Sequence, residues 1–185
     1  MTNHILLNPI TNHVLDSLSK CKEELLIAVP FISRFAKSIL TQDDLVKIKS
    51  KKLITCFDEH NLNSFELETL KYLIENNVEI IFNNNIHLKL YLFDNEGIIT
   101  SSNLTKSGFE DSIELTSTIE SVNIEKSRTL FNQLWKQSEN NIITLELIEK
   151  NYPKYLLLKK RTSYIKKKKL SLKTTEIKLS NFDLK

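Results

Sequence analysis

Residues 87–105 read HLKLYLFDNEGIITSSNLT, and this stretch predicts how the middle of the chain folds. Residues 87–93 alternate and are rich in Leu and Tyr, which is typical of a β-strand. Residues 94–97 (DNEG) form a turn sequence that leads into the apolar pair at residues 98–99. The stretch therefore predicts a β-hairpin.

Strands and helices are expected to alternate on both sides of this hairpin. Short apolar runs predict the strands, and amphipathic spacing predicts the helices. The expected strands are residues 25–29, 53–57, 78–82 and 113–119, and the expected helices are residues 10–20, 34–49 with an interruption near Gln42, 65–76 with Asn63 or Ser64 as its cap, and 124–137. This order indicates an α/β fold with a mixed, mostly parallel β-sheet flanked by helices on both faces.

The charge of the chain is unevenly spread. Its 185 residues, enough for one α/β domain, carry a net charge of +3. Residues 154–185 hold 11 Lys and Arg against two acidic residues, so the first 153 residues have a net charge of −6. We expect a catalytic domain at residues 1–153 and a basic C-terminal extension at residues 154–185. The extension could be a helix, an edge strand or a disordered arm.

Several classes of protein are excluded by features that the sequence lacks. Cys21 and Cys56 have no CxxC spacing, so core thiols are expected rather than a zinc or redox site. His60 stands beside acidic residues in DEHN, but no second ligand cluster accompanies it, so no metal is expected. No apolar window reaches the roughly 18 to 20 residues of a membrane span, and the first residues do not resemble a secretory signal. We expect a cytoplasmic protein.

The side chains of residues 87–114 suit reaction at a phosphodiester. Residues two apart on a strand face the same side, so His87 and Lys89 are expected to project together. A phosphodiester is anionic and poorly electrophilic, so an imidazole nucleophile needs an ammonium group and hydrogen-bond donors around the phosphate oxygens. Lys89 and Asn103 could supply these, and Glu114 could hold one imidazole nitrogen while the other attacks.

The spacing of these residues resembles a known motif. His87, Lys89 and Asp94 fit the pattern H-x-K-x4-D, and residues 101–103 then fit S-x-N. An acidic residue, Glu114, follows further on. This arrangement resembles the HKD motif of the phospholipase D superfamily, although Thr100 stands where the family usually has Gly.

The resemblance implies a phospholipase D-like fold and a role for each motif residue. It implies a mechanism through a covalent phosphohistidine, formed without a metal or any other cofactor. The implied catalytic residues are His87 as the nucleophile, Lys89 and Asn103 as phosphate ligands, Ser101 as a supporting hydroxyl and Glu114 as the acid that orients a histidine, while Asp94 gives structural support.

The resemblance also implies a homodimer, because the family's active site contains two motifs and this chain has one. One His87 would attack phosphorus while the other protonates the leaving oxygen and then activates water. Single-motif dimers of the family are commonly nucleases, so we expect a metal-independent nuclease that hydrolyses DNA, or RNA. Two alternatives stay open, a phospholipid hydrolase or transferase and a nucleic-acid-binding module without turnover.

The basic extension favours nucleic acid as the partner, and we expect DNA rather than RNA. Each lysine that neutralises a phosphate releases a condensed counterion, although a merely solvated tail is the alternative. The residues expected to contact nucleic acid are Lys159, Lys160, Arg161, Lys166, Lys167, Lys168 and Lys169. Tyr155 and Tyr164 interleave with these cations, and they either stack on bases or anchor the extension to the body.

Overall fold

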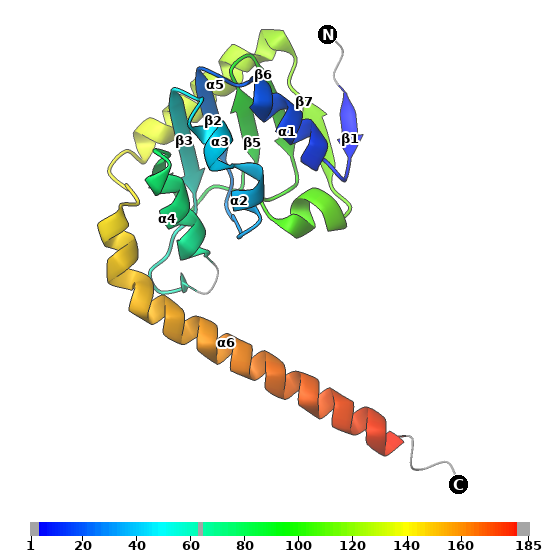
Figure 1. Ribbon diagram of the computed structural model, residues 1–185. Coiled ribbons are helices and arrows are strands. Elements are labelled where there is room, and N and C mark those ends of the chain that lie inside the picture. The colour runs from blue at the N-terminus through cyan, green and yellow to red at the C-terminus, as the bar shows by residue number, and fades with distance from the viewer. Residues whose placement is uncertain (1–3, 63–64, 181–185) are drawn as a thin grey trace.

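The computed structural model describes residues 4–62 and 65–180, with side chains described up to Thr162. Within these residues, helices pack against a seven-stranded sheet (Figure 1). The strands are β1 (Ile5–Leu7), β2 (Glu24–Ala28), β3 (Ser50–Thr55), β4 (Glu79–Phe82), β5 (Leu90–Phe93), β6 (Glu96–Thr100) and β7 (Leu115–Thr118). The helices are α1 (Thr11–Lys20), α2 (Ala36–Ile39), α3 (Gln42–Leu45), α4 (Leu67–Glu75), α5 (Ser121–Gln137) and α6 (Leu145–Ser180), with a short π-helix, η2 (Ser107–Asp111).

The strand order in the sheet is β1-β7-β6-β5-β2-β3-β4. The predicted mixed sheet between helices is confirmed, but the expected majority of parallel pairs is wrong. Of the six strand pairs in the described part of the chain, β2–β3 and β3–β4 are parallel and four are antiparallel. The tight turn between β5 and β6 can join only antiparallel strands. The wrong expectation arose elsewhere, because β2 pairs with β5, a strand far away in the chain, and an apolar run does not reveal that neighbour.

The central strand β2 is buried on both faces, which explains its unbroken apolar sequence. Leu25 and Ile27 belong to a core cluster that also contains residues of α1, α2 and α4. Leu26 and Ala28 point to the other face and pack in a second cluster with Ile124 and Phe131 of α5. Alternate residues of one strand therefore hold helices on opposite faces of the sheet (Figure 1).

Most of the predicted elements lie within a few residues of the observed ones. The interrupted helix expected at residues 34–49 is two short helices, α2 and α3. The edge strand β1 was not predicted, because three residues are too few to show a periodic pattern. The expected cap at Asn63 or Ser64 lies outside the described residues.

Helix α6 runs through Pro153 to Ser180, so the basic extension is a helix for most of its length. Figure 1 shows α6 changing direction in its first part, as expected for a helix that contains an internal proline. The helix continues past the expected boundary at residue 153, and Tyr155 belongs to the main core cluster. None of the described helices combines the length and the apolar character needed to cross a bilayer.

Candidate active site

The candidate residues gather at one end of the β5–β6 hairpin. His87 and Lys89 lie in extended chain just before β5, and residues 101–103 follow β6 directly. Leu90 pairs with Ile99, and the Thr100 N–H donates to the Lys89 carbonyl oxygen at 3.1 Å. The hairpin register therefore places the two halves of the motif side by side.

Lys89 is held against the imidazole of His87. Its Nζ lies 3.4 Å from His87 Nε2 and donates to the His87 carbonyl oxygen at 2.9 Å. Lys89 is only 6% exposed, whereas His87 is exposed. Burial lowers the pKa of Lys89 below its ordinary value, and the nearby Glu114 and Cys56 partly oppose this shift. The site therefore pairs an accessible imidazole with a partly desolvated ammonium.

Glu114 contacts the loop after β6. The Ser101 hydroxyl donates to Glu114 Oε2 and accepts the Leu115 N–H at 3.1 Å, so Ser101 links the start of β7 to the end of β6. Among the contacts of the described residues, none joins Glu114 to His87. The orienting role expected for Glu114 therefore stays a prediction, and within one chain its carboxylate holds Ser101 and lies near Lys89.

Asn103 presents an amide that the described residues do not saturate. Its Oδ1 is buried without a hydrogen-bond partner, and its Nδ2 donates to none of the described groups. The backbone here is tightly turned, because the Thr105 N–H donates to the Asn103 carbonyl oxygen at 2.7 Å. Asn103 Nδ2 is therefore available to donate to an anionic oxygen.

Thr100 stabilises the loop that carries these groups. Its hydroxyl accepts from Thr116 Oγ1 at 2.7 Å and from the Ser102 N–H at 3.1 Å, and it donates to the Leu115 carbonyl oxygen at 3.2 Å. All of this is buried, since Thr100 is 7% exposed and Thr116 is 0% exposed. The residue that departs from the family pattern thus holds the S-x-N segment, which sequence reasoning missed.

Gly108 in η2 packs directly on the Asn103 segment. A Cβ at this position would lie 2.4 Å from the Asn103 carbonyl oxygen and 3.1 Å from its backbone nitrogen. Only a residue without a side chain permits this approach. No sequence pattern predicts this contact, because the glycine follows Asn103 by five residues in a stretch without a strand or α-helix pattern.

Asp94 lies at the opposite end of the hairpin and anchors it to β2. Its carboxylate accepts the backbone N–H groups of Lys22, Glu23 and Glu24 at 2.8, 2.9 and 2.7 Å. Partial burial alone would raise the pKa of Asp94, but these backbone hydrogen bonds and the Cys21 thiol hold it below the ordinary value. Asp94 therefore contributes to the fold and touches no candidate catalytic side chain.

The basic residues expected to bind nucleic acid all lie on α6. Lys159 is already paired with Glu66, with Nζ 3.3 Å from Oε2, and Arg161 is exposed. Lys160 lies between them, and the side chains of residues 166–169 lie outside those described. Tyr155 is 2% exposed and thus anchors the helix in the core, while the side chain of Tyr164 is not among those described.

Two of the other histidines lie at the turn end of the hairpin, away from the candidate site. His4 and His13 line a separate pocket beside α1, and His60 is exposed in the loop after β3. Within the described ranges, no group of three or more His, Cys, Asp and Glu side chains is arranged to hold a metal ion.

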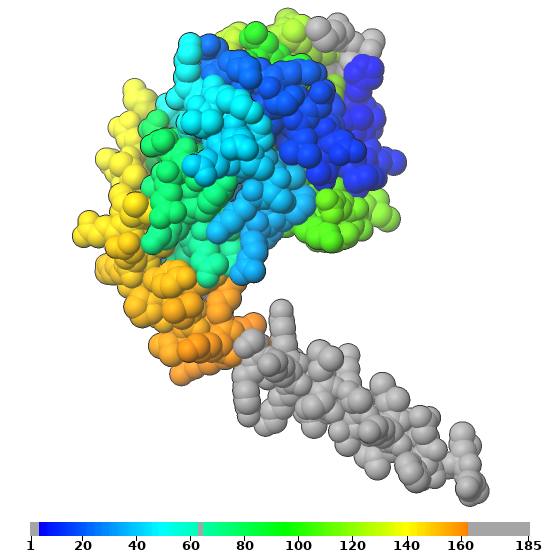
Figure 2. Space-filling model, in the orientation of Figure 1, coloured from blue at the N-terminus to red at the C-terminus, as the bar shows by residue number. Residues whose placement is uncertain are grey.

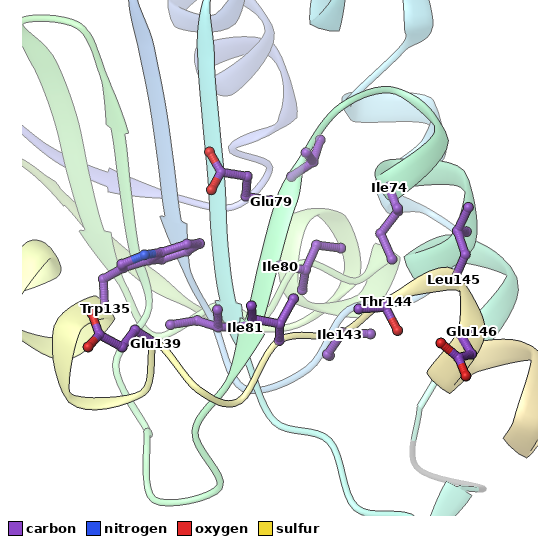
Figure 3. A pocket seen from close by; sticks show the side chains of 12 residues that line it. Ile74, Glu79, Ile80, Ile81, Trp135, Glu139, Ile143, Thr144, Leu145 and Glu146 are labelled. Atoms are coloured by element: carbon purple, nitrogen blue, oxygen red, sulfur yellow. The ribbon is translucent and has the colours of Figure 1, made fainter.

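A cavity of about 550 Å³ lies along β4, and no candidate catalytic residue lines it. Figure 3 shows its apolar wall, which includes Ile81 and Trp135, together with Glu79, Glu139 and Glu146. The lining contains carboxylates and no Lys or Arg. Such a lining repels a polyanion, so this cavity is not a phosphodiester site.

Known proteins share this fold. Residues 14–135, which include the whole cluster from His87 to Glu114, match the family model described as cardiolipin synthase, PLD-like domain. NucT from Helicobacter pylori is similar with a TM-score of 0.59 and 18% identity, over 78% of this chain and 99% of that chain. Nuc from Salmonella typhimurium, a phospholipase D family member, has a TM-score of 0.57 and 16% identity over 77% of this chain and 96% of that one.

A larger enzyme is similar over part of its length. The phosphatidylserine synthase of Haemophilus influenzae Rd KW20 has a TM-score of 0.60 and 18% identity, over 91% of this chain but 47% of its own. No curated protein has a sequence that matches this chain significantly. The identities to the solved structures are low and show the fold alone, whereas the family model covers well over half of the 185 residues. The chain belongs to the phospholipase D superfamily.

Proposed function

We propose that this protein is a phosphodiesterase that hydrolyses nucleic acid, preferably DNA, through a covalent phosphohistidine and without a metal. The observation that carries the proposal is the pairing of Lys89 Nζ with His87 Nε2 at 3.4 Å, beside the unsaturated amide of Asn103. An exposed imidazole next to a buried ammonium suits attack on an anionic phosphorus centre.

The reaction follows from these groups in two displacements. His87 attacks phosphorus and the bond to the leaving oxygen breaks, giving a phosphohistidine. Lys89 and Asn103 Nδ2 donate to the non-bridging oxygens and stabilise the charge that gathers there. A second histidine protonates the leaving oxygen, then takes a proton from water as the water attacks the phosphohistidine and the P–N bond breaks.

The second histidine would come from a second copy of the chain. Among the described residues, His4 and His13 line a pocket with Asn95 and Glu96 at the turn end of the hairpin, and no contact joins His60 to His87. A homodimer supplies a second His87 through two-fold symmetry. The proposed enzyme is therefore inactive as a monomer.

An uncovered part of the sheet supports dimer formation. Ile5, Leu7, Ile99 and Leu115 are 70%, 66%, 49% and 54% exposed, which is unusual for apolar residues in strands. Ile5 and Ile99 both pair with Ser117, and Ile99 also pairs with Leu90, which packs in the α5 cluster. These side chains therefore share the α5 face of the sheet and form what we call the open face, which a second copy could cover.

The length of the chain relative to its structural neighbours, and the charge of its basic extension, favour nucleic acid over lipid as the substrate. The chain matches NucT and Nuc over nearly their whole length, but the phosphatidylserine synthase over only 47% of its length. The basic extension, with 11 Lys and Arg against two acidic residues, suits a polyanion. We therefore propose a catalytic domain at residues 1–153 and a nucleic-acid-binding extension at residues 154–185, acting in the cytoplasm.

The proposal is tested by cleavage of labelled single- and double-stranded DNA and RNA in excess EDTA. The native protein should cleave at least one of these substrates, and His87→Ala should lower the rate by at least about a thousandfold, because it removes the nucleophile. His13→Ala is the matched control, since His13 lines a pocket at the turn end of the hairpin, opposite the candidate site. Cleavage that needs a metal ion, or that survives His87→Ala, would contradict the proposal.

The lipid alternative rests on the phosphatidylserine synthase likeness and has its own test. Phospholipid vesicles replace nucleic acid in the same assay. Release of headgroups by the native protein, with nucleic acid left intact, would replace the nuclease proposal with a lipid one.

A further inference from the structure

The base of α6 is fastened to the segment before α4 by three side chains. The Tyr155 hydroxyl donates to Glu66 Oε1 at 2.6 Å, and Lys159 Nζ lies 3.3 Å from Glu66 Oε2. Lys159 also lies over the Tyr155 ring, 5.1 Å from its centroid. We call these three residues the clasp. It holds α6 through a buried aromatic ring and a charge pair, rather than through the helix backbone.

The clasp lies at the end of the sheet that carries the candidate site. Lys154 Nζ donates to the Glu59 carbonyl oxygen at 2.7 Å, in the loop that follows β3. β3 is parallel to β2, and Ala28 at the end of β2 pairs with Leu90, next to Lys89, so this loop leaves the sheet at the end that carries the candidate site. Figure 2 shows the base of α6, in orange, against the lower end of the body. One loop therefore connects the site to the base of α6.

Lys159 is held in the clasp by its ion pair with Glu66. The side chains of Lys159 and Glu66 are 37% and 19% exposed, so the pair is only partly hydrated. Moving Lys159 to a phosphate would leave a partly buried carboxylate without its partner, which costs free energy. Lys159 is therefore poorly suited to bind a polyanion, although it is adjacent in sequence to other cations.

Beyond the clasp, α6 continues to Ser180 and leaves the body (Figure 1). The sequence places eight Lys and Arg and one acidic residue at positions 160–180. A helix of this length spans roughly 30 Å, the length of about nine base pairs of duplex. The cations therefore lie on a long helix that starts near the catalytic end of the sheet.

We propose that α6 is a substrate-binding arm, held by the clasp at the catalytic end, which contacts the nucleic-acid backbone away from the scissile phosphate. Lys159 is an anchor of this arm, and the cations from Lys166 to Lys169 are its phosphate contacts. The inference rests on the proposed function in taking nucleic acid as the substrate. It implies selection by length, because a fragment of a few nucleotides cannot reach the site and the arm together.

The test measures how binding depends on salt, in the full-length chain with His87→Ala so that the DNA stays intact. Fluorescence anisotropy with a 30-base-pair duplex gives the slope of log affinity against log salt concentration. Replacing Lys166–Lys169 by Gln should reduce this slope by about 3 to 4, since each phosphate contact contributes about 0.9. Lys159→Gln should leave the slope unchanged, as should Lys126→Gln, an exposed control on α5.

A second variant tests whether the salt dependence changes when the ion pair of the clasp is removed. Lys159→Gln combined with Glu66→Gln removes both charges and keeps an acceptor for the Tyr155 hydroxyl, and it should also keep the native slope. A length series of duplexes should show affinity rising until about ten base pairs in the native arm, with a much flatter rise when Lys166–Lys169 are Gln.

Two results would overturn the inference. An unchanged slope in the Lys166–Lys169 variant would mean that the arm does not contact DNA, and a slope reduced by about 1 in Lys159→Gln would mean that Lys159 binds phosphate. Failure of the proposed function is separate. If the salt slopes of the variants are as expected but the native protein cleaves no phosphodiester, then the inference about the arm is supported and the proposed catalytic function is wrong.

Discussion

At the scale of single residues, the burial of Lys89 governs the chemistry of the candidate site. A lysine that is 6% exposed loses hydration of its ammonium, and this desolvation lowers its pKa. Glu114 opposes the shift without a direct bond to Lys89. The charge state of the proposed phosphate ligand therefore depends on a carboxylate that also holds Ser101.

The first prediction concerns pH. In the proposed mechanism the ammonium form of Lys89 binds phosphate, so kcat/KM should fall on the alkaline side at a lower pH than an ordinary lysine would give. Glu114→Gln removes the negative charge that raises the pKa of Lys89, so the alkaline limb of its residual activity should move to still lower pH. A limb that stays in place, or moves to higher pH, would show that Glu114 does not act on Lys89.

At the scale of elements, the β5–β6 hairpin is fixed at both ends. Asp94 ties its turn to the start of β2, and Thr100 ties its open end to β7. Gly108 then brings η2 against the segment that carries Asn103. The position of the candidate groups depends on these contacts and not on the hairpin alone.

The second prediction concerns the Asp94 anchor. The pKa of Asp94 is lowered by folding, so its carboxylate stabilises the fold above the unfolded value of about 3.9, and this stability is lost as pH falls through the folded pKa. Asp94→Asn should lower the free energy of unfolding by about 1 to 3 kcal/mol at pH 7, as measured by urea denaturation. The difference should narrow as the pH drops below about 4.

The control is Asp43→Asn on α3, an exposed carboxylate, which should change the free energy of unfolding by less than about 0.5 kcal/mol. If Asp94→Asn were equally destabilising at pH 7 and at pH 3, the carboxylate charge would not be the source of the stability.

The third prediction compares the two glycines of the chain. A Cβ at Gly97 would meet the flexible end of Leu92 at 2.6 Å, whereas a Cβ at Gly108 would meet the Asn103 backbone oxygen at 2.4 Å. Both Ala substitutions should destabilise the fold by about 1 to 3 kcal/mol. At a temperature where both variants are folded, only Gly108→Ala should lower kcat/KM, by about tenfold or more, because it moves Asn103. Equal activity losses in both variants would contradict this reading.

Local pattern predicted the elements well, and long-range contacts explain what it missed. The hairpin follows from the alternation and spacing of neighbouring residues, although β5 begins at Leu90, so His87 and Lys89 precede the strand that was expected to carry them. The Thr100–Thr116 and Tyr155–Glu66 contacts join residues far apart in the chain, and they exist only once the sheet register and the path of α6 are set. The prediction of a mostly parallel sheet was wrong for the same reason. An apolar run does not reveal which strand will lie beside it in the sheet.

At the scale of the whole molecule, the proposed mechanism needs two copies of the chain. A single chain offers one exposed His87, and the open face leaves apolar side chains of β1, β6 and β7 in water. The proposed two-fold dimer would join the two histidines and cover the open face.

The fourth prediction follows from the open face. Ile99→Lys places a charge within it and should dissociate the dimer, as measured by analytical ultracentrifugation, with activity lost in parallel because each monomer has one histidine at its site. Val46→Lys is the matched control, since Val46 is 76% exposed at the end of α3, on the other face of the sheet. A monomeric native protein with full activity would contradict the dimer.

The central claim is the covalent phosphohistidine on His87, and the most direct test is the stereochemistry at phosphorus. A cleavable substrate with one chiral phosphorothioate linkage is hydrolysed in ¹⁸O-labelled water, and the configuration of the product is determined. Two successive in-line displacements, each with inversion, should give net retention. Net inversion would mean that water attacks phosphorus directly, and the covalent mechanism would then be wrong.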